Sequence, residues 1–144
     1  MPRMRILIST SALALLAACA SPQQQPQQTQ DAVYSPMQTP SGLIFQMTRM
    51  GSGDTPRPTD TVRVNYRGMF PDGREFDSSN GKPAEFPLDH VIKCWTEGLQ
   101  LMKPGGKAWL ICPAALAYGE KGAGATIPPN ATLHFDVELL QVKR

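Results

Sequence analysis

One loop near the C-terminus reads Tyr118-Gly119-Glu120-Lys121-Gly122-Ala123-Gly124-Ala125-Thr126-Ile127-Pro128-Pro129. It opens on a tyrosine, continues through glycines and closes on a proline pair, directly before an alternating apolar segment. No helical pattern follows the glycines, so they do not form a phosphate-cradling loop. We therefore expect the loop to hold a phenol and a few apolar side chains over a shallow pocket, which suits an apolar peptide segment.

The segments around this loop have the character of β-strands. Residues 61–67 alternate strictly, and residues 131–142 place the side chains of Leu133, Phe135, Val137 and Leu139 on one face. Further strands are expected at residues 43–48, 74–77 and 107–112. Pro71-Asp72-Gly73 predicts a turn, because proline presets φ and glycine accepts a positive φ.

A single amphipathic helix is predicted from Val91 to Met102. Its apolar residues, Ile92, Trp95, Leu99 and Met102, recur at helical spacing, and Pro104-Gly105-Gly106 follows as a stop signal. Strands with one short helix lying across them indicate an α+β domain built on an antiparallel sheet.

The N-terminal part has a different composition. Residues 1–18 carry Arg3 and Arg5 before an apolar run, which is typical of a secretory signal. Leu16-Ala17-Ala18-Cys19 is similar to a bacterial lipobox, so we expect Cys19 to be acylated and the protein to be held at the outer membrane, facing the periplasm. Residues 19–40 are rich in glutamine and proline and are expected to form a disordered tether. The domain is then expected at residues 41–144.

Charge and composition exclude several kinds of function. Without Arg3 and Arg5, twelve basic residues balance twelve acidic ones, so the chain has no electrostatic footprint for nucleic acid. His90 and His134 have no cysteine or histidine at metal-ligand spacing, which predicts a surface or rim position and no metal. We expect no cofactor, membrane contact only through the lipid anchor, and a monomer, since no pairing helix precedes the domain.

Cys94 and Cys112 are the two cysteines within the expected domain. An oxidising compartment favours a disulfide between them. The alternative is two separate buried cysteines that act as small apolar residues.

Six short motifs in order resemble the FKBP family of peptidyl-prolyl cis-trans isomerases, which bind macrolides. They are Val62-x-Val64-x-Tyr66-x-Gly68, Asp72-Gly73-x-x-Phe76-Asp77-Ser78-Ser79, Val91-Ile92-x-x-Trp95-x-Glu97-Gly98, Leu116-Ala117-Tyr118-Gly119, Ile127-Pro128-Pro129 and Leu133-x-Phe135-Asp136-Val137-Glu138-Leu139-Leu140. The resemblance covers residues 42–141 and implies a bent antiparallel sheet wrapped around one short helix. Lys93-Cys94 departs from the proline and glycine that many members carry before the tryptophan.

The resemblance also implies roles for individual residues. Trp95 would form the floor of the pocket, lined by Tyr66, Phe76 and Phe135, with Asp77 beside Tyr66 as a polar wall. The hydroxyl of Tyr118 and the backbone N–H of Ile92 would donate to carbonyls of a bound peptide. The remaining apolar positions are Val91 on the rim and Phe86 and Ile127 on the sides.

The expected function is isomerisation of X-Pro bonds in unfolded or exported proteins, without a covalent step, with macrolides as inhibitors. The alternative is a non-catalytic peptide-binding chaperone or surface interaction module on the same fold.

Overall fold

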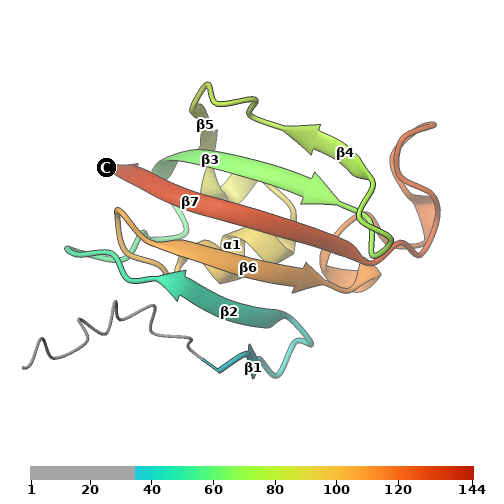
Figure 1. Cartoon of the computed structure of the whole chain (residues 1–144), viewed down its shortest axis with the longest axis horizontal. Helices are drawn as coiled ribbons and strands as arrows, with labels where there is room; N and C mark the ends of the chain where they lie inside the picture. The colour runs from blue at the N-terminus through green and yellow to red at the C-terminus, as the bar shows by residue number, and fades with distance from the viewer. Residues whose placement is uncertain (1–34) are drawn as a thin grey trace, which may run out of the picture.

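The structure, a computed structural model, describes residues 35–144 (Figure 1). The predicted signal segment, Cys19 and most of the tether lie outside these residues. The strands are β1 (Met37–Gln38), β2 (Ile44–Arg49), β3 (Thr61–Met69), β4 (Glu75–Ser78), β5 (Ala84–Pro87), β6 (Lys107–Cys112) and β7 (Leu133–Lys143). The helix α1 spans Lys93–Leu99, and the 3₁₀ turns are η1 (Leu88–His90), η2 (Ala114–Leu116) and η3 (Gly119–Lys121).

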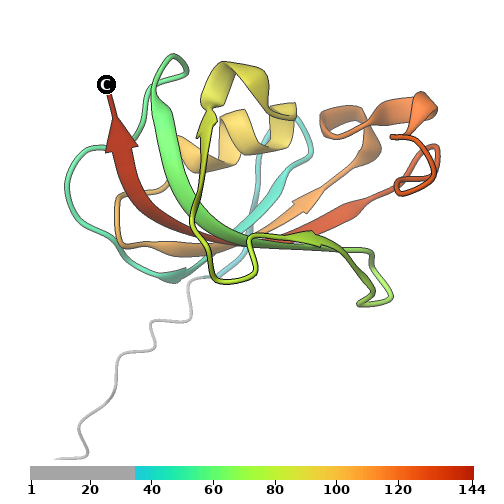
Figure 2. The same cartoon turned by 90° about the horizontal axis from the view of Figure 1, so that it is seen from above.

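The strands form one antiparallel sheet in the order β1-β2-β6-β7-β3-β4, with β5 pairing β3. The sheet bends around α1, which lies on its concave side (Figure 2). The alternating residues predicted to face inward on β7 are all buried, as are Val62 and Val64 on β3 and Ala108, Leu110 and Cys112 on β6. The structure thus confirms the predicted α+β fold, an antiparallel sheet wrapped around one short helix.

Strand β3 has two partners in succession along one side. Its first half pairs with β5, up to Val64 opposite Ala84, and its second half pairs with β4, from Arg67 opposite Ser78. Between these two ladders, Asn65 and Tyr66 have no strand beside them on that side. The other side of β3 pairs with β7 from Thr61 to Met69, with a register shift between Arg63 and Val64.

The helix is shorter than predicted. Val91 and Ile92 are extended, and Ile92 is the N-cap of α1 without any side-chain cap. After Leu99 the chain continues in tight turns, in which the N–H of Met102 donates to Leu99 O at 3.1 Å. Met102 is nevertheless fully buried. The apolar spacing that includes Met102 therefore indicated a buried side chain, although the α-helix ends before this residue.

Two strands were not predicted, and one of them moves a boundary. The predicted tether ends at Pro40, whereas Met37 and Gln38 already pair with Phe45 and Ile44 as β1. Both β1 residues are exposed, so no apolar alternation marked them. Strand β5 is four residues long and only partly buried, which is too short for a periodic signal.

In residues 35–144 no helix has the length and apolar character needed to cross a membrane.

A disulfide joins Cys94 on α1 to Cys112 at the end of β6, with Cα atoms 5.7 Å apart. Both residues are fully buried. The bond fastens the helix to the sheet one residue before Trp95, so it holds the helix end that contributes to the site described next.

Candidate active site

A cavity of about 380 Å³ opens at the side of α1. It is lined by Tyr66, Phe76, Asp77, Phe86, His90, Val91, Ile92, Trp95, Tyr118 and Phe135. Nine of these ten were singled out from the sequence, and they come from β3, β4, β5, β7, α1 and the loops beside it. His90 completes the lining, and its position directly before Val91 was the signal that could have placed it there.

The floor of the cavity is a packed set of aromatic rings. The indole of Trp95 is 5% exposed and meets the rings of Phe86 and Phe135 edge-on, with centroids 5.5 and 5.4 Å apart. Phe76 continues the set, with its ring 5.7 Å from that of Phe135. The Nε1 of Trp95 has no hydrogen-bond partner among the described residues. The floor is thus formed by four aromatic side chains that pack edge to face.

Gly68 makes room for this arrangement. A Cβ at Gly68 would lie 2.6 Å from Cζ of Phe76 and 3.0 Å from Cε1 of Phe135. Only a residue without a side chain lets these two rings lie against β3. Gly68, the glycine of the first motif, is therefore explained by the two aromatic rings that lie directly against its Cα.

A polar pair lies at the edge of the aromatic floor. The hydroxyl of Tyr66 donates to Oδ2 of Asp77 at 2.8 Å. Burial, then this hydrogen bond and the nearby carboxylate charge, raise the pKa of Tyr66 to about 12. The phenol therefore stays protonated across the physiological range and serves Asp77 as a donor.

Two donors at the rim are free for a ligand. Among residues 35–144, the hydroxyl of Tyr118 makes no hydrogen bond, and Tyr118 is 42% exposed. The N–H of Ile92 likewise has no acceptor in this part of the chain, although the carbonyl of Ile92 accepts bonds from Trp95 and Thr96. Both residues line the cavity. The two donors can therefore meet backbone carbonyls of a peptide placed over Trp95.

Ile127 does not line the cavity. It is 4% exposed in the hydrophobic core, and its backbone forms a two-way bridge with Ala123. Gly122 has φ of 63°, and a Cβ there would lie 2.2 Å from Ile127 O. The loop thus folds tightly back on Ile127 and packs it in the hydrophobic core that also contains Trp95 and Phe135, and its predicted role in substrate binding stays a prediction.

The described residues offer little to a metal ion. Residues 35–144 contain no group of three or more histidine, cysteine or carboxylate residues able to hold one. His90 instead contacts Asp89, with Nδ1 2.6 Å from Oδ1 at the exposed rim. The cavity therefore offers apolar surface, one carboxylate and a few donors.

The family model for FKBP-type peptidyl-prolyl cis-trans isomerases matches residues 52–140. The chain belongs to this family. The FKBP motifs therefore coincide with the residues that build the cavity, and the resemblance stated from the sequence is confirmed.

Named relatives agree with this family. A probable FKBP-type isomerase of Haemophilus influenzae is 58% identical over 106 residues, which are 72% of this chain and 44% of that protein. FkpA of Escherichia coli K12 is 53% identical over 105 residues, 72% of this chain and 38% of FkpA. The chain thus spans less than half the length of these curated relatives.

Solved structures show the same FKBP fold. The crystal structure of FkpA from Escherichia coli has a TM-score of 0.72 at 51% identity, covering 75% of this chain and 51% of that one. A peptidyl-prolyl cis-trans isomerase from Pseudomonas syringae has a TM-score of 0.73 at 38% identity, covering 76% and 81%.

Proposed function

We propose that this FKBP domain is a peptidyl-prolyl cis-trans isomerase that accelerates rotation of X-Pro bonds in its apolar cavity. The observation that carries the proposal is the pairing of an aromatic floor at Trp95 with two donors, Tyr118 and the N–H of Ile92, that make no hydrogen bond within residues 35–144. A cavity serving only as packing would have no reason to leave donors open at its rim.

The chemistry requires no nucleophile and no proton transfer. Rotation about an amide costs about 18–20 kcal/mol because it breaks conjugation, and an X-Pro bond isomerises in tens to hundreds of seconds. The half-rotated amide has less charge separation between its oxygen and nitrogen than either planar form. A floor of Trp95, Phe76 and Phe135 therefore favours the twisted form, and such differential binding lowers the barrier.

The rim donors supply orientation. With one carbonyl held by Tyr118 and a neighbouring one by Ile92, the peptide backbone on either side of the proline is fixed in a turn. Fixing the backbone on both sides of the proline removes part of the entropy cost of reaching the half-rotated X-Pro amide. Asp77 keeps the Tyr66 phenol in place as the polar side of the cavity and has no acid or base role.

The substrates are proline-containing segments of unfolded or exported proteins, and the protein is held in the bacterial envelope. The sequence supports this location through the basic and apolar start of the chain and the lipobox-like Leu16-Ala17-Ala18-Cys19. Acylation of Cys19 would anchor the domain at the outer membrane, facing the periplasm. Labelling of cells with a tagged fatty acid tests this, because Cys19→Ser should abolish the label.

A proline-limited refolding assay with the full-length chain tests the activity. The expected result is faster refolding of the client, and inhibition by a macrolide that competes for the cavity. A chain that binds an unfolded client without changing its refolding rate would be a peptide-binding module, and the isomerase proposal would be wrong.

A further inference from the structure

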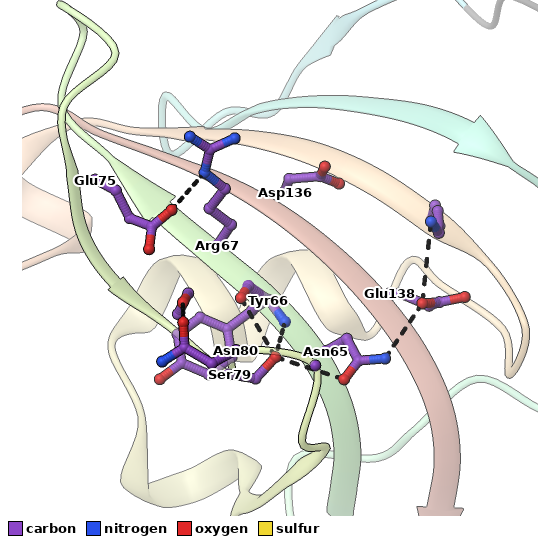
Figure 3. Close-up of a pocket in the computed structure, with 11 residues that line it drawn as sticks. Asn65, Tyr66, Arg67, Glu75, Ser79, Asn80, Asp136 and Glu138 are labelled. Atoms are coloured by element: carbon purple, nitrogen blue, oxygen red, sulfur yellow. Dashed lines mark hydrogen bonds and ion pairs between the residues drawn. The ribbon is translucent and has the colours of Figure 1, made fainter.

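A second hollow, of about 360 Å³, lies on the outer face of the sheet, where β3 passes from β5 to β4 (Figure 3). Tyr66 lines both this hollow and the aromatic cavity. Its backbone belongs to the outer side, in the gap between the two ladders, while its ring contacts Trp95. What holds the Tyr66 backbone in that gap therefore also sets the position of its ring.

Ser79 bonds to Tyr66 in the gap between β5 and β4, where no strand lies beside β3 on this side. Its backbone N–H donates to Tyr66 O at 3.0 Å, and its Oγ accepts the N–H of Tyr66 at 3.1 Å. Both backbone groups of Tyr66 on this side are thus satisfied by one residue. Without the Oγ, a part-buried N–H would be left unpaired, which is unfavourable and therefore favours movement of the peptide.

The same short segment also holds the other end of Tyr66. Asp77, two residues before Ser79, accepts the Tyr66 hydroxyl at 2.8 Å. Ser79 therefore holds the backbone of Tyr66, and Asp77 holds its phenol. We propose that Ser79 is a positioning residue of the isomerase site, whose hydroxyl fixes the Tyr66 backbone so that the phenol stays on Asp77 at the cavity wall.

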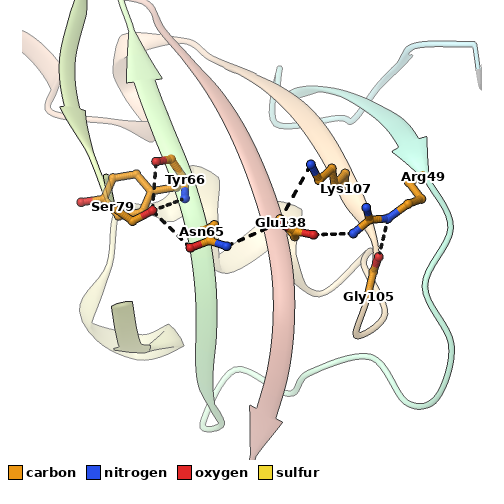
Figure 4. A network of polar contacts seen from close by, with 7 residues as sticks. All are labelled: Arg49, Asn65, Tyr66, Ser79, Gly105, Lys107 and Glu138. Atoms are coloured by element: carbon orange, nitrogen blue, oxygen red, sulfur yellow. Dashed lines mark hydrogen bonds and ion pairs between the residues drawn. The ribbon is translucent and has the colours of Figure 1, made fainter. Parts of the chain in front are cut away.

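A longer polar network continues from Ser79 across the outer face (Figure 4). Ser79 Oγ lies 3.5 Å from Asn65 Oδ1, and Asn65 Nδ2 lies 3.4 Å from Glu138 Oε2. Glu138 also contacts Arg49 and Lys107, and the hydrogen bond from Arg49 lowers the pKa of Glu138. The links through Asn65 are long and weak. The effect on the cavity is therefore concentrated in Ser79.

Three variants of the full-length chain test this role. Ser79→Ala removes the acceptor for the Tyr66 N–H, and Ser79→Thr keeps a hydroxyl. Ser78→Ala is the matched control, because Ser78 Oγ donates to Asn80 Oδ1, at 2.7 Å, and makes no hydrogen bond to Tyr66. The effect on catalysis rests on the proposed isomerase function, so a second readout follows Tyr66 itself.

That readout is the ionisation of Tyr66, measured by NMR of chain labelled at the tyrosine Cζ. In the unaltered chain and in Ser78→Ala, Tyr66 should remain protonated at pH 11, as a pKa of about 12 requires. In Ser79→Ala the pKa should fall, because the part of the increase that comes from the hydrogen bond to Asp77 is lost, while the part that comes from burial remains. A displaced Tyr66 ring should also lower kcat/KM about tenfold, because a small misplacement of a group in an active site slows the reaction strongly. Ser79→Thr should restore both properties.

Each outcome decides the proposal. Wild-type ionisation of Tyr66 in folded Ser79→Ala overturns it, whatever the activity does. A shifted ionisation with kcat/KM unchanged also overturns it, because catalysis then does not depend on the position that Ser79 gives Tyr66. If the unaltered chain has no isomerase activity, the proposed function fails, while the ionisation still tests whether Ser79 places Tyr66. Should Ser79→Ala not fold, Ser79→Cys, with its weak sulfur acceptor, is titrated instead.

Discussion

The indole of Trp95 meets the ring of Tyr66 edge-on, with centroids 5.1 Å apart and planes inclined by 80°. The floor of the cavity and its polar wall are therefore one packed unit. Edge-to-face pairs of this kind contribute about 0.5–1.5 kcal/mol beyond the area that they bury. Changes to the floor should consequently affect stability and the site together, whereas changes at the rim should affect the site alone.

Trp95→Ala is expected to harm both stability and catalysis. Removal of a buried tryptophan costs about 3–5 kcal/mol, because the surrounding rings cannot fill the space. Urea unfolding should show this loss, and kcat/KM for an X-Pro peptide should fall even where the variant is folded. A variant with normal stability would contradict the burial of Trp95.

Tyr118→Phe is expected to lower kcat/KM about three- to tenfold, as for the loss of one hydrogen bond, without unfolding the domain. The reason is that its hydroxyl makes no hydrogen bond to any described residue, so only the bound peptide loses a partner. Trp109→Phe is the control, because Trp109 is equally exposed, at 42%, and does not line the cavity. Unchanged kcat/KM for Tyr118→Phe would remove the proposed donor role.

Gly68→Ala should displace the ring of Phe76, since the new methyl group would lie 2.6 Å from Cζ of that ring. Overpacking of this kind costs about 1–3 kcal/mol. Thermal unfolding should show the loss, together with a fall in kcat/KM. The double variant with Phe76→Leu has a side chain that can move aside, so it should recover stability but not activity. If Gly68→Ala lost no stability, the rings of Phe76 and Phe135 would be less tightly packed against β3 than the structure shows.

Removing the disulfide with Cys94→Ala and Cys112→Ala should lower the free energy of unfolding by about 3 kcal/mol, as for a closed loop of similar length. The two cysteines are 18 residues apart in sequence. Well below the melting temperature, kcat/KM should change less than twofold, because the aromatic floor is held by packing as well. Equal stability of the oxidised chain and the double variant would contradict this prediction.

Alkaline pH should weaken the fold through Tyr66. Its pKa is raised in the folded state from 10.0 to about 12, so the folded state holds the proton more tightly than the unfolded state does. The resulting stability is fully present below pH 10 and is lost as the pH rises toward 12. Relative to Tyr66→Phe, which cannot ionise there, the unaltered chain should lose on the order of 1 kcal/mol between pH 8 and pH 11. A constant difference in urea unfolding would argue against the raised pKa.

The alternation of β3, β6 and β7 was readable from the sequence because each buries one face. The FKBP motifs contain eight of the residues that line the cavity, and the resemblance as a whole added Phe86. The same reasoning missed β1 and β5, which bury too little to leave a pattern, and it extended α1 to Met102 because burial continues after the helix ends. The motif containing Ile127 gave the position of this residue in the chain but not the direction of its side chain, which the structure packs in the core. The support of Tyr66 by Ser79 depends on a gap between two ladders, which no local pattern encodes.

The chain enters its folded part through β1, at one edge of the sheet, while Tyr66 and Asp77 lie on β3 and β4 at the opposite edge. In the sheet, β2, β6 and β7 lie between β1 and the strand that carries Tyr66. A tag or fusion partner added on the N-terminal side would therefore join the domain at the sheet edge away from the cavity's polar wall.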